Sequence, residues 1–188
     1  MEAARSNPED NKMLARLALA LVDHPRATLQ QLAKCLGIGR TTLHRFCSTR
    51  EELIARLVEH SADVLLEATL AARLLEDSPR EALRRLIANH LEHRELTAFL
   101  LYHWKAVDMG DVECRWEQLL DEFFLHGQKL GAFRIDIPAQ TLTEAWTGVL
   151  IGLVEGEHRG RVARFGMVNL LEDFFLNGAG LAKSAEQG

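Results

Sequence analysis

The chain has 188 residues, of which 47% are hydrophobic and 26% charged, and a formal net charge of −5. This composition is typical of a globular protein and excludes a disordered or fibrous chain. The cysteines Cys35, Cys47 and Cys114 lie far apart and do not form the paired pattern of a disulfide-rich secreted domain. The start, MEAARSNPEDNK, is polar, and no apolar run approaches the ~20 residues of a membrane span, so we expect a cytoplasmic protein.

Apolar residues recur at helical spacing along nearly the whole chain. The first predicted helix ends before Pro25, which cannot continue it. A short second helix has Thr28 as its N-cap and ends at Gly37. A third, also short, begins at Gly39 or Arg40.

Six further helices are predicted after this pair. STREEL is typical of a capping box and opens a helix from about Glu51 to Leu75. The others are SPREALRRLIANHLEH, RELTAFLLYHWKAV, DVECRWEQLLDEFFLHGQKLG, PAQTLTEAWTGVLIGLVEG and residues 162–177. The alternating segment GAFRIDIP is too short and too closely bounded by Gly131 and Pro138 to favour a strand. We therefore predict an all-α fold of about nine helices, with one domain at 1–60 and a helical bundle at 61–188.

Basic residues gather in one interval of this acidic protein. Between His24 and Arg50 there is no acidic residue, and the basic ones are Arg26, Lys34, Arg40, Arg45 and Arg50. A contact surface for phosphates needs local charge, whatever the net charge of the molecule. A solvated helical face accounts for the same pattern, so charge alone leaves both interpretations open.

The stretch TLQQLAKCLGIGRTTLHRF has the pattern of a helix-turn-helix. Two helices that cross steeply need a small residue at their closest approach, a glycine in the turn and apolar residues facing inward. Ala33, Gly37, Leu43 and Phe46 supply these. The residues that remain to face outward from the second helix all have side chains that can form hydrogen bonds: Arg40, Thr41, Thr42, His44 and Arg45. This combination predicts DNA binding.

Here the sequence resembles a known family. TLQQLAKCLGIGRTTLHRFCSTREEL, followed by a long helix, is similar to the DNA-binding domain of the TetR family of bacterial transcriptional regulators, over about Leu14–Leu57. The remainder matches in architecture, and GAFRIDIPAQTLTEAWTGVLIGLV is similar to the family's entry into its dimerisation helices. The resemblance implies a homodimeric, ligand-responsive repressor that binds a pseudo-palindromic operator and is released by a small-molecule effector.

The recognition helix departs from the family pattern. His44 stands where members usually have a tyrosine, and Cys47 and Ser48 stand where an aromatic residue and a proline usually follow. Because histidine titrates near neutral pH, we expect operator affinity to rise as pH falls. Cys47 is interpreted as a packed small residue, with a redox sensor as the alternative.

Residue roles on DNA follow from chemistry. Arg40, Thr41 and Thr42 lie at the N-terminus of the recognition helix, which enters the major groove, and are predicted to contact base edges. The residues predicted to contact phosphates are Thr28, His44 and Arg50. Capping alone also explains Thr28. For Arg45 a solvated position is as plausible as DNA contact.

Glycines recur at every fourth position near the C-terminus, at Gly148, Gly152, Gly156 and Gly160. Each costs helix stability, about 1 kcal/mol relative to alanine, which close helix packing would repay. We expect a dimer interface at Gly148 and Gly152 with residues of the last helix, namely Leu171, Phe174 and Phe175. The last two glycines are equally explained as ending the helix.

The middle helices are rich in large side chains with polar groups. The family resemblance implies an effector pocket among them, and the candidate residues are His90, Phe99, Tyr102, His103, Trp116, Phe123 and Trp146. Core packing is the alternative for each. As a set they favour an apolar or aromatic effector. No cofactor is expected, and no metal, although His90, His93 and His103 offer ligand atoms.

Two other classes of function remain as alternatives. An enzyme is disfavoured because the sequence contains no nucleophile elbow, phosphate-binding glycine loop or metalloprotease signature. A helical interaction module with a vestigial helix-turn-helix is supported only by the departures at His44 and Cys47. The effector, the operator and the sign of regulation do not follow from the sequence.

Overall fold

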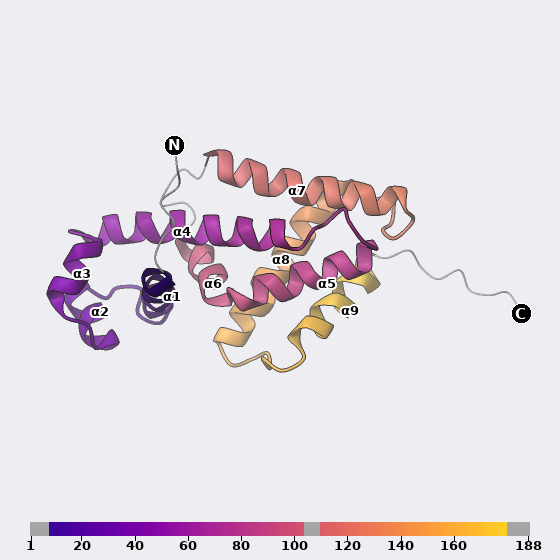
Figure 1. The fold of residues 1–188 in the computed structure, drawn as a ribbon. Coiled ribbons are helices and arrows are strands. Elements are labelled where there is room, and N and C mark those ends of the chain that lie inside the picture. Colours follow the sequence, from indigo (N-terminus) through magenta and orange to yellow (C-terminus); the bar gives the residue numbers. More distant parts are fainter. Residues whose placement is uncertain (1–7, 104–109, 180–188) are drawn as a thin grey trace, which may run out of the picture. The chain divides into compact units, whose positions relative to one another are not determined.

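The computed structural model describes residues 8–103 and 110–179, and within them the regular structure is nine α-helices (Figure 1). In chain order they are α1 (Pro8–Asp23), α2 (Leu29–Leu36), α3 (Arg40–Phe46), α4 (Arg50–Ala71), α5 (Pro79–Glu92), α6 (Arg94–His103), α7 (Gly110–Lys129), α8 (Ala139–His158) and α9 (Met167–Ala179). The predicted all-α fold is confirmed. None of these helices combines the length and the apolar character that crossing a membrane requires.

The chain divides into two compact units. The first comprises Met1–Val64 and Arg94–Met109, and the second Leu65–His93 and Gly110–Gly188. Helix α6 packs on α1 and therefore belongs with the N-terminal helices, although it is distant from them in sequence. The functional division at residue 60 stays a prediction.

The first unit has a core of leucines contributed by its four N-terminal helices. The side chains of Leu17, Leu32 and Leu57 are fully buried, and Leu43 of α3 is nearly so. Helix α4 begins with the predicted capping box: the Glu52 amide donates to Thr49 Oγ1 (3.1 Å), and Glu52 Oε2 accepts from the Ser48 amide (2.7 Å). Backbone amides that no helical carbonyl reaches are thus satisfied.

The core of the second unit forms between α5, α7, α8 and α9. Four phenylalanines meet in it, which we call the phenylalanine cluster: Phe123, Phe124, Phe133 and Phe175. Phe133 comes from the α7–α8 loop, and its ring lies against Gly127, where a Cβ would be 2.3 Å from the ring carbons. The loop predicted for GAFRIDIP is thus tied to the bundle by a side chain that only a glycine on α7 admits.

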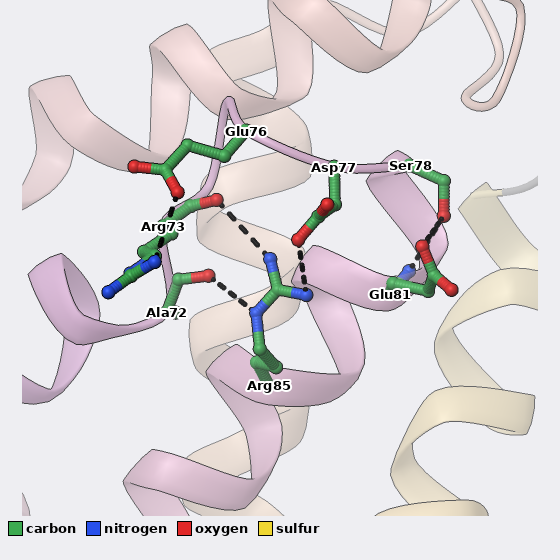
Figure 2. A network of polar contacts seen from close by, with 7 residues as sticks. All are labelled: Ala72, Arg73, Glu76, Asp77, Ser78, Glu81 and Arg85. Carbon is green, nitrogen blue, oxygen red and sulfur yellow. Dashed lines mark hydrogen bonds and ion pairs between the residues drawn. The ribbon is translucent and has the colours of Figure 1, made fainter.

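The junction between α4 and α5 differs from the prediction (Figure 2). The helix predicted to reach Leu75 ends at Ala71. Arg73 has φ 49°, a left-handed conformation through which a right-handed α-helix cannot continue. The cause lies in α5: Arg85 Nε donates to the Ala72 carbonyl (3.0 Å), Nη2 to the Arg73 carbonyl (3.4 Å), and Nη1 pairs with Asp77 (2.9 Å). One guanidinium thus satisfies the helix end, a tertiary contact that local periodicity does not contain.

Candidate functional site

Helices α2 and α3 form the predicted helix-turn-helix. At the start of α2, the Gln31 amide donates to Thr28 Oγ1 (3.3 Å) and the Thr28 amide donates to Gln31 Oε1 (2.8 Å), a reciprocal capping box. At its end Gly37 has φ 65°, and the Ile38 amide donates back to the Ala33 carbonyl (3.0 Å). This left-handed residue reverses the chain within two residues, so that α3 begins at Arg40.

The outward face of α3 is polar, as the sequence predicts. Thr41, Thr42 and His44 are exposed, whereas Leu43 and Phe46 point into the core with 2% and 9% exposure. The side chains of Arg40 and Arg45 lie outside the part of the chain that the structure describes. An exposed row of hydroxyl and imidazole groups on a short helix can meet base edges and phosphates.

A cleft of about 280 Å³ joins two residues predicted to contact phosphates. It is lined by Thr28, Leu29, Gln30 and Ala33 from the N-terminal part of α2 and by Leu43 and His44 of α3. The first-turn amides of α2 and the imidazole of His44 therefore border one concave surface. Helix N-termini attract anions through their free amides and their dipole. The geometry suits a phosphate that bridges the two helices.

Arg50, the third predicted phosphate residue, has contacts within the protein. Its Nε donates to the Ala27 carbonyl (3.3 Å) and its Nη2 to the Pro25 carbonyl (2.5 Å), so it holds the turn before α2 against the start of α4.

Two other arginines also donate to backbone carbonyls and thereby cap helix C-termini. Arg16 Nη2 donates to the carbonyl of Leu36, the last residue of α2 (3.0 Å), and Arg56 Nη1 donates to the carbonyl of Phe46, the last residue of α3. Sequence reasoning missed this capping role, although cations are favoured at helix C-termini.

Cys47 is buried and lies at the end of α3, with its Sγ 3.8 Å from the Leu43 carbonyl oxygen. Burial, and then the charge of Glu52, raise the pKa of its thiol, against a smaller opposing effect of Arg56. A buried thiol with a raised pKa is a poor nucleophile. The packing interpretation of Cys47 is favoured over the redox one.

The predicted dimer residues separate into two groups. Gly148 and Gly152 on α8 are exposed, and a Cβ at either would meet nothing within 4 Å, whereas at Gly156 it would lie 2.7 Å from Val162. On α9, Phe174 is 64% exposed, but Leu171 and Phe175 are buried within the protomer. Gly160 has φ 70° and belongs to the turn after α8.

Three of the predicted effector residues meet in the second unit. His90 of α5 and Trp116 of α7 contact Thr69 of α4, and Trp146 of α8 packs against both rings; we call these four residues the Trp–His cluster. Ring centroids lie 5.2 Å apart for His90 and Trp146, and 6.1 Å apart for the two tryptophans. Burial lowers the pKa of His90 to about 4, with a smaller lowering from His93 and an opposing hydrogen bond to Leu86.

The other predicted effector residues do not join this cluster. Phe123 belongs to the phenylalanine cluster. Phe99, Tyr102 and His103 belong to the first unit, where the Phe99 and His103 rings stack at 4.6 Å. Burial, and then the charge of Arg50, lower the pKa of His103. Among the described residues, no group of three or more metal-ligating side chains gathers.

Comparison with known proteins gives the chain its family. No family model matches it. The transcriptional regulator NfxB of Pseudomonas aeruginosa, which is of the helix-turn-helix type, is 43% identical over 175 residues, which cover 90% of this chain and 94% of NfxB.

Two solved structures share its fold. One is the TetR-like regulator LfrR of Mycobacterium smegmatis in complex with proflavine, with a TM-score of 0.69, 21% identity and coverage of 92% of this chain and 98% of LfrR. The other is the TetR family regulator PfmR of Thermus thermophilus, with a TM-score of 0.70, 22% identity and coverage of 92% and 100%. With its capped helix-turn-helix and all-α fold, the chain belongs to the TetR family of bacterial transcriptional regulators.

Proposed function

We propose that this regulator is a repressor that binds a pseudo-palindromic operator as a homodimer and is released by a small apolar or aromatic effector. It acts on double-stranded DNA in the cytoplasm and has no catalytic step. The observation that carries the proposal is the exposed polar face of α3, which follows the capped helix α2 and borders the cleft at Thr28 and His44.

On the operator, Arg40, Thr41 and Thr42 contact base edges, and Thr28 and His44 contact phosphates. Arg45 and Arg50 add positive charge near the backbone of the DNA. For Arg50 the bonds to the Pro25 and Ala27 carbonyls add a positioning role, because they fix the entry to α2. Phosphate contacts give salt dependence without sequence preference, and base contacts give the opposite.

Footprinting on the gene's own upstream region tests the DNA part. We expect a palindromic footprint whose affinity falls steeply with salt. Arg40→Ala should relax base preference, with a loss of about 1–3 kcal/mol at one position of each half-site. His44→Phe keeps the ring but should weaken all sites alike and flatten the salt slope. Glu59→Gln, an exposed change on α4, is the control. An unspecific footprint at every salt concentration would refute operator binding.

The dimer interface in this proposal uses the open face of α8 and the exposed apolar side chains of α9. Gly148 and Gly152 leave room for a partner helix, and Phe174 with Leu170 offers 64% and 46% exposed side chains one turn apart. Leu171 and Phe175 support this face from beneath, because they are buried within the protomer. Burial of such apolar surface stabilises an interface by about 25 cal/mol per Å².

Sedimentation equilibrium tests the interface. Gly152→Leu should shift the chain toward monomer at least tenfold, because the new side chain fills the space reserved for the partner, while helix content is unchanged. Gln118→Leu, exposed on α7, adds the same bulk elsewhere and should leave the dimer intact. Equal dissociation constants for both variants would place the interface on another face.

The effector part of the proposal is supported by the aromatic composition of the second unit and by the Trp–His cluster. Phe123, of the same unit, is a further candidate for contact with this effector, whereas Phe99, Tyr102 and His103 of the first unit stay candidates from the sequence. LfrR, which shares the fold, has been solved with proflavine, a planar aromatic molecule. A thermal-shift screen of small aromatic compounds, followed by gel shifts with each hit, tests the proposal: a true effector raises the melting temperature and releases DNA.

A further inference from the structure

The Trp–His cluster contains more hydrogen-bonding atoms than it can satisfy internally. Its Thr69 side chain is 1% exposed, and the hydroxyl oxygen has three polar neighbours: the Leu65 carbonyl oxygen at 2.9 Å, Trp116 Nε1 at 3.0 Å and His90 Nε2 at 3.4 Å. Trp116 can only donate, so it uses one lone pair of the hydroxyl. The hydroxyl has one proton for the other two neighbours.

The Thr69 hydroxyl donates its proton to the Leu65 carbonyl, because that oxygen lies 0.5 Å nearer to Thr69 Oγ1 than His90 Nε2 does. His90 Nδ1 lies 3.0 Å from the Leu86 carbonyl oxygen, an acceptor only, so Nδ1 carries the hydrogen of the neutral imidazole. Nε2 is then an acceptor without a full donor. The His90 ring is 1% exposed, so its Nε2 is a buried acceptor whose contact is the long one to Thr69 Oγ1 (3.4 Å).

The neighbouring indole presents the complementary deficiency. Trp146 is fully buried, and its Nε1–H has no hydrogen-bond partner among the described residues. Its ring meets the His90 ring edge to face, with centroids 5.2 Å apart. One unsatisfied donor and one under-satisfied acceptor thus lie on adjacent buried rings. Buried polar atoms are rarely left unpaired, so this pair indicates a ligand that supplies the missing partners.

The charges around the cluster indicate what kind of ligand this is. The pKa of His90, lowered to about 4 by burial, leaves the imidazole neutral at physiological pH, and among the described residues the side chain whose charge acts on it is His93. On α7, the carboxylate of Asp121 accepts a hydrogen bond from Thr143 Oγ1 (2.6 Å). Within the part of the chain that the structure describes, no carboxylate contributes to the shift of the His90 pKa. A cation here would be desolvated without a counter-charge.

We propose that the Trp–His cluster binds the effector, and that this effector is an uncharged planar aromatic molecule with an acceptor for Trp146 Nε1 and a donor for His90 Nε2. The inference rests on the proposed function, which supplies the existence of an effector, and adds the chemical class and two specificity-determining residues. Trp116, the half-buried member of the cluster, is the wall that moves to admit the ligand. The rings of the cluster then stack on the bound ligand.

Three probes with one three-ring frame test the class by titration calorimetry on the full chain. Acridone has a carbonyl acceptor and an N–H donor, xanthone has the carbonyl but no N–H, and proflavine is a cation at neutral pH. Acridone should bind best. Xanthone should bind about five- to tenfold more weakly because the donor is missing, and proflavine at least tenfold more weakly.

Two variants separate the two hydrogen bonds. Trp146→Phe removes the indole N–H and should weaken acridone and xanthone alike, about five- to tenfold. His90→Phe removes the acceptor and should weaken acridone only, because xanthone has no proton to donate. Phe124→Leu, a change of similar burial in the phenylalanine cluster, should alter neither affinity. Circular dichroism verifies that each variant is folded.

The proposal is overturned if acridone does not bind, if proflavine binds more tightly than acridone, or if Trp146→Phe and Phe124→Leu have equal effects. Gel shifts on the same preparations keep the proposed function separate. Specific DNA binding without acridone binding refutes the effector class alone, whereas acridone binding without any specific DNA site refutes the repressor and leaves the ligand site standing.

Discussion

Glu172 on α9 is the residue whose replacement makes the sharpest prediction about stability. Its side chain is 5% exposed, and Arg80 Nε lies 2.8 Å from Oε1 while Arg84 Nη1 lies 2.5 Å from Oε2. Both arginines come from α5, one turn apart, so a single carboxylate ties α9 to α5. We predict that Glu172→Gln lowers the free energy of unfolding by about 1–2 kcal/mol.

The magnitude follows from opposing effects. Each charge-assisted hydrogen bond contributes about 1.5–3 kcal/mol, and the glutamine amide keeps one acceptor but turns an NH₂ group toward a guanidinium. Against this, removing the charge also removes the cost of burying a carboxylate. The arginine side chains are 68% and 53% exposed and return to water, so the full penalty of an orphaned buried charge does not apply. The melting temperature should fall by about 2–8 °C.

The pH dependence has a definite sign. Burial raises the pKa of Glu172, but the hydrogen bonds and charges of Arg80 and Arg84 outweigh it and leave the pKa below its ordinary 4.5. A depressed pKa contributes stability that is present above the unfolded-state value and is lost as pH falls through the folded-state value. Urea denaturation of wild type and Glu172→Gln should therefore differ most near pH 7 and converge below pH 4.

The neighbouring exposed acid provides the control, because Asp173→Asn removes the same charge from α9 without breaking the two bonds. It should change stability by less than about 0.5 kcal/mol. If Glu172→Gln is as stable as wild type at pH 7, or if its deficit persists undiminished at pH 3, the carboxylate does not act as described.

Three further predictions concern the elements that position the sites. Arg85→Met should lower the free energy of unfolding measured in urea by about 1–3 kcal/mol, because the Ala72 and Arg73 carbonyls lose their donor. The control is Arg73→Gln, which removes an exposed ion pair with Glu76 and should lower the same free energy by less than about 1 kcal/mol. Gly37→Ala should cost about 1–2 kcal/mol at φ 65°, and Gly37→Asn less than half of that, in the same assay; equal losses would point to something other than backbone strain. In the native protein, N-ethylmaleimide should label Cys35 and Cys114 and spare Cys47, as mass spectrometry before and after unfolding would reveal; rapid native labelling of Cys47 would reopen the redox interpretation.

The sequence predicted the elements of the fold well because the signals that define them are local. Thr28, Gly37 and the STREEL capping box start and stop helices by contacts within a few residues, and the structure contains each of them. The end of α4 was predicted four residues too late because its cause, Arg85, lies 13 residues from Ala72. Helical periodicity records which face is buried and says nothing of a side chain that arrives from another helix.

The candidate sites were predictable only in part, and the reason is again distance. Exposed polar residues on α3 follow from one helix's own pattern, whereas the bonds of Arg50 to the Pro25 and Ala27 carbonyls join residues more than 20 positions apart and could not be predicted from local sequence. Likewise, the predicted effector residues were selected by composition. Which of them share a unit depends on how the helices pack, and Phe99 and Trp146 belong to different units.

Most buried polar side chains of the second unit have an internal explanation. The Glu172 carboxylate has two arginines, Thr143 donates to Asp121, and the Thr69 hydroxyl donates to a carbonyl of its own helix. Against this background the unpaired indole N–H of Trp146 is a cost to the fold, because a buried donor without a partner has lost its hydrogen bond to water. Among the described residues of this unit, Glu155 Oε2 is also buried without a partner, so what distinguishes Trp146 Nε1 is its place beside an under-satisfied histidine.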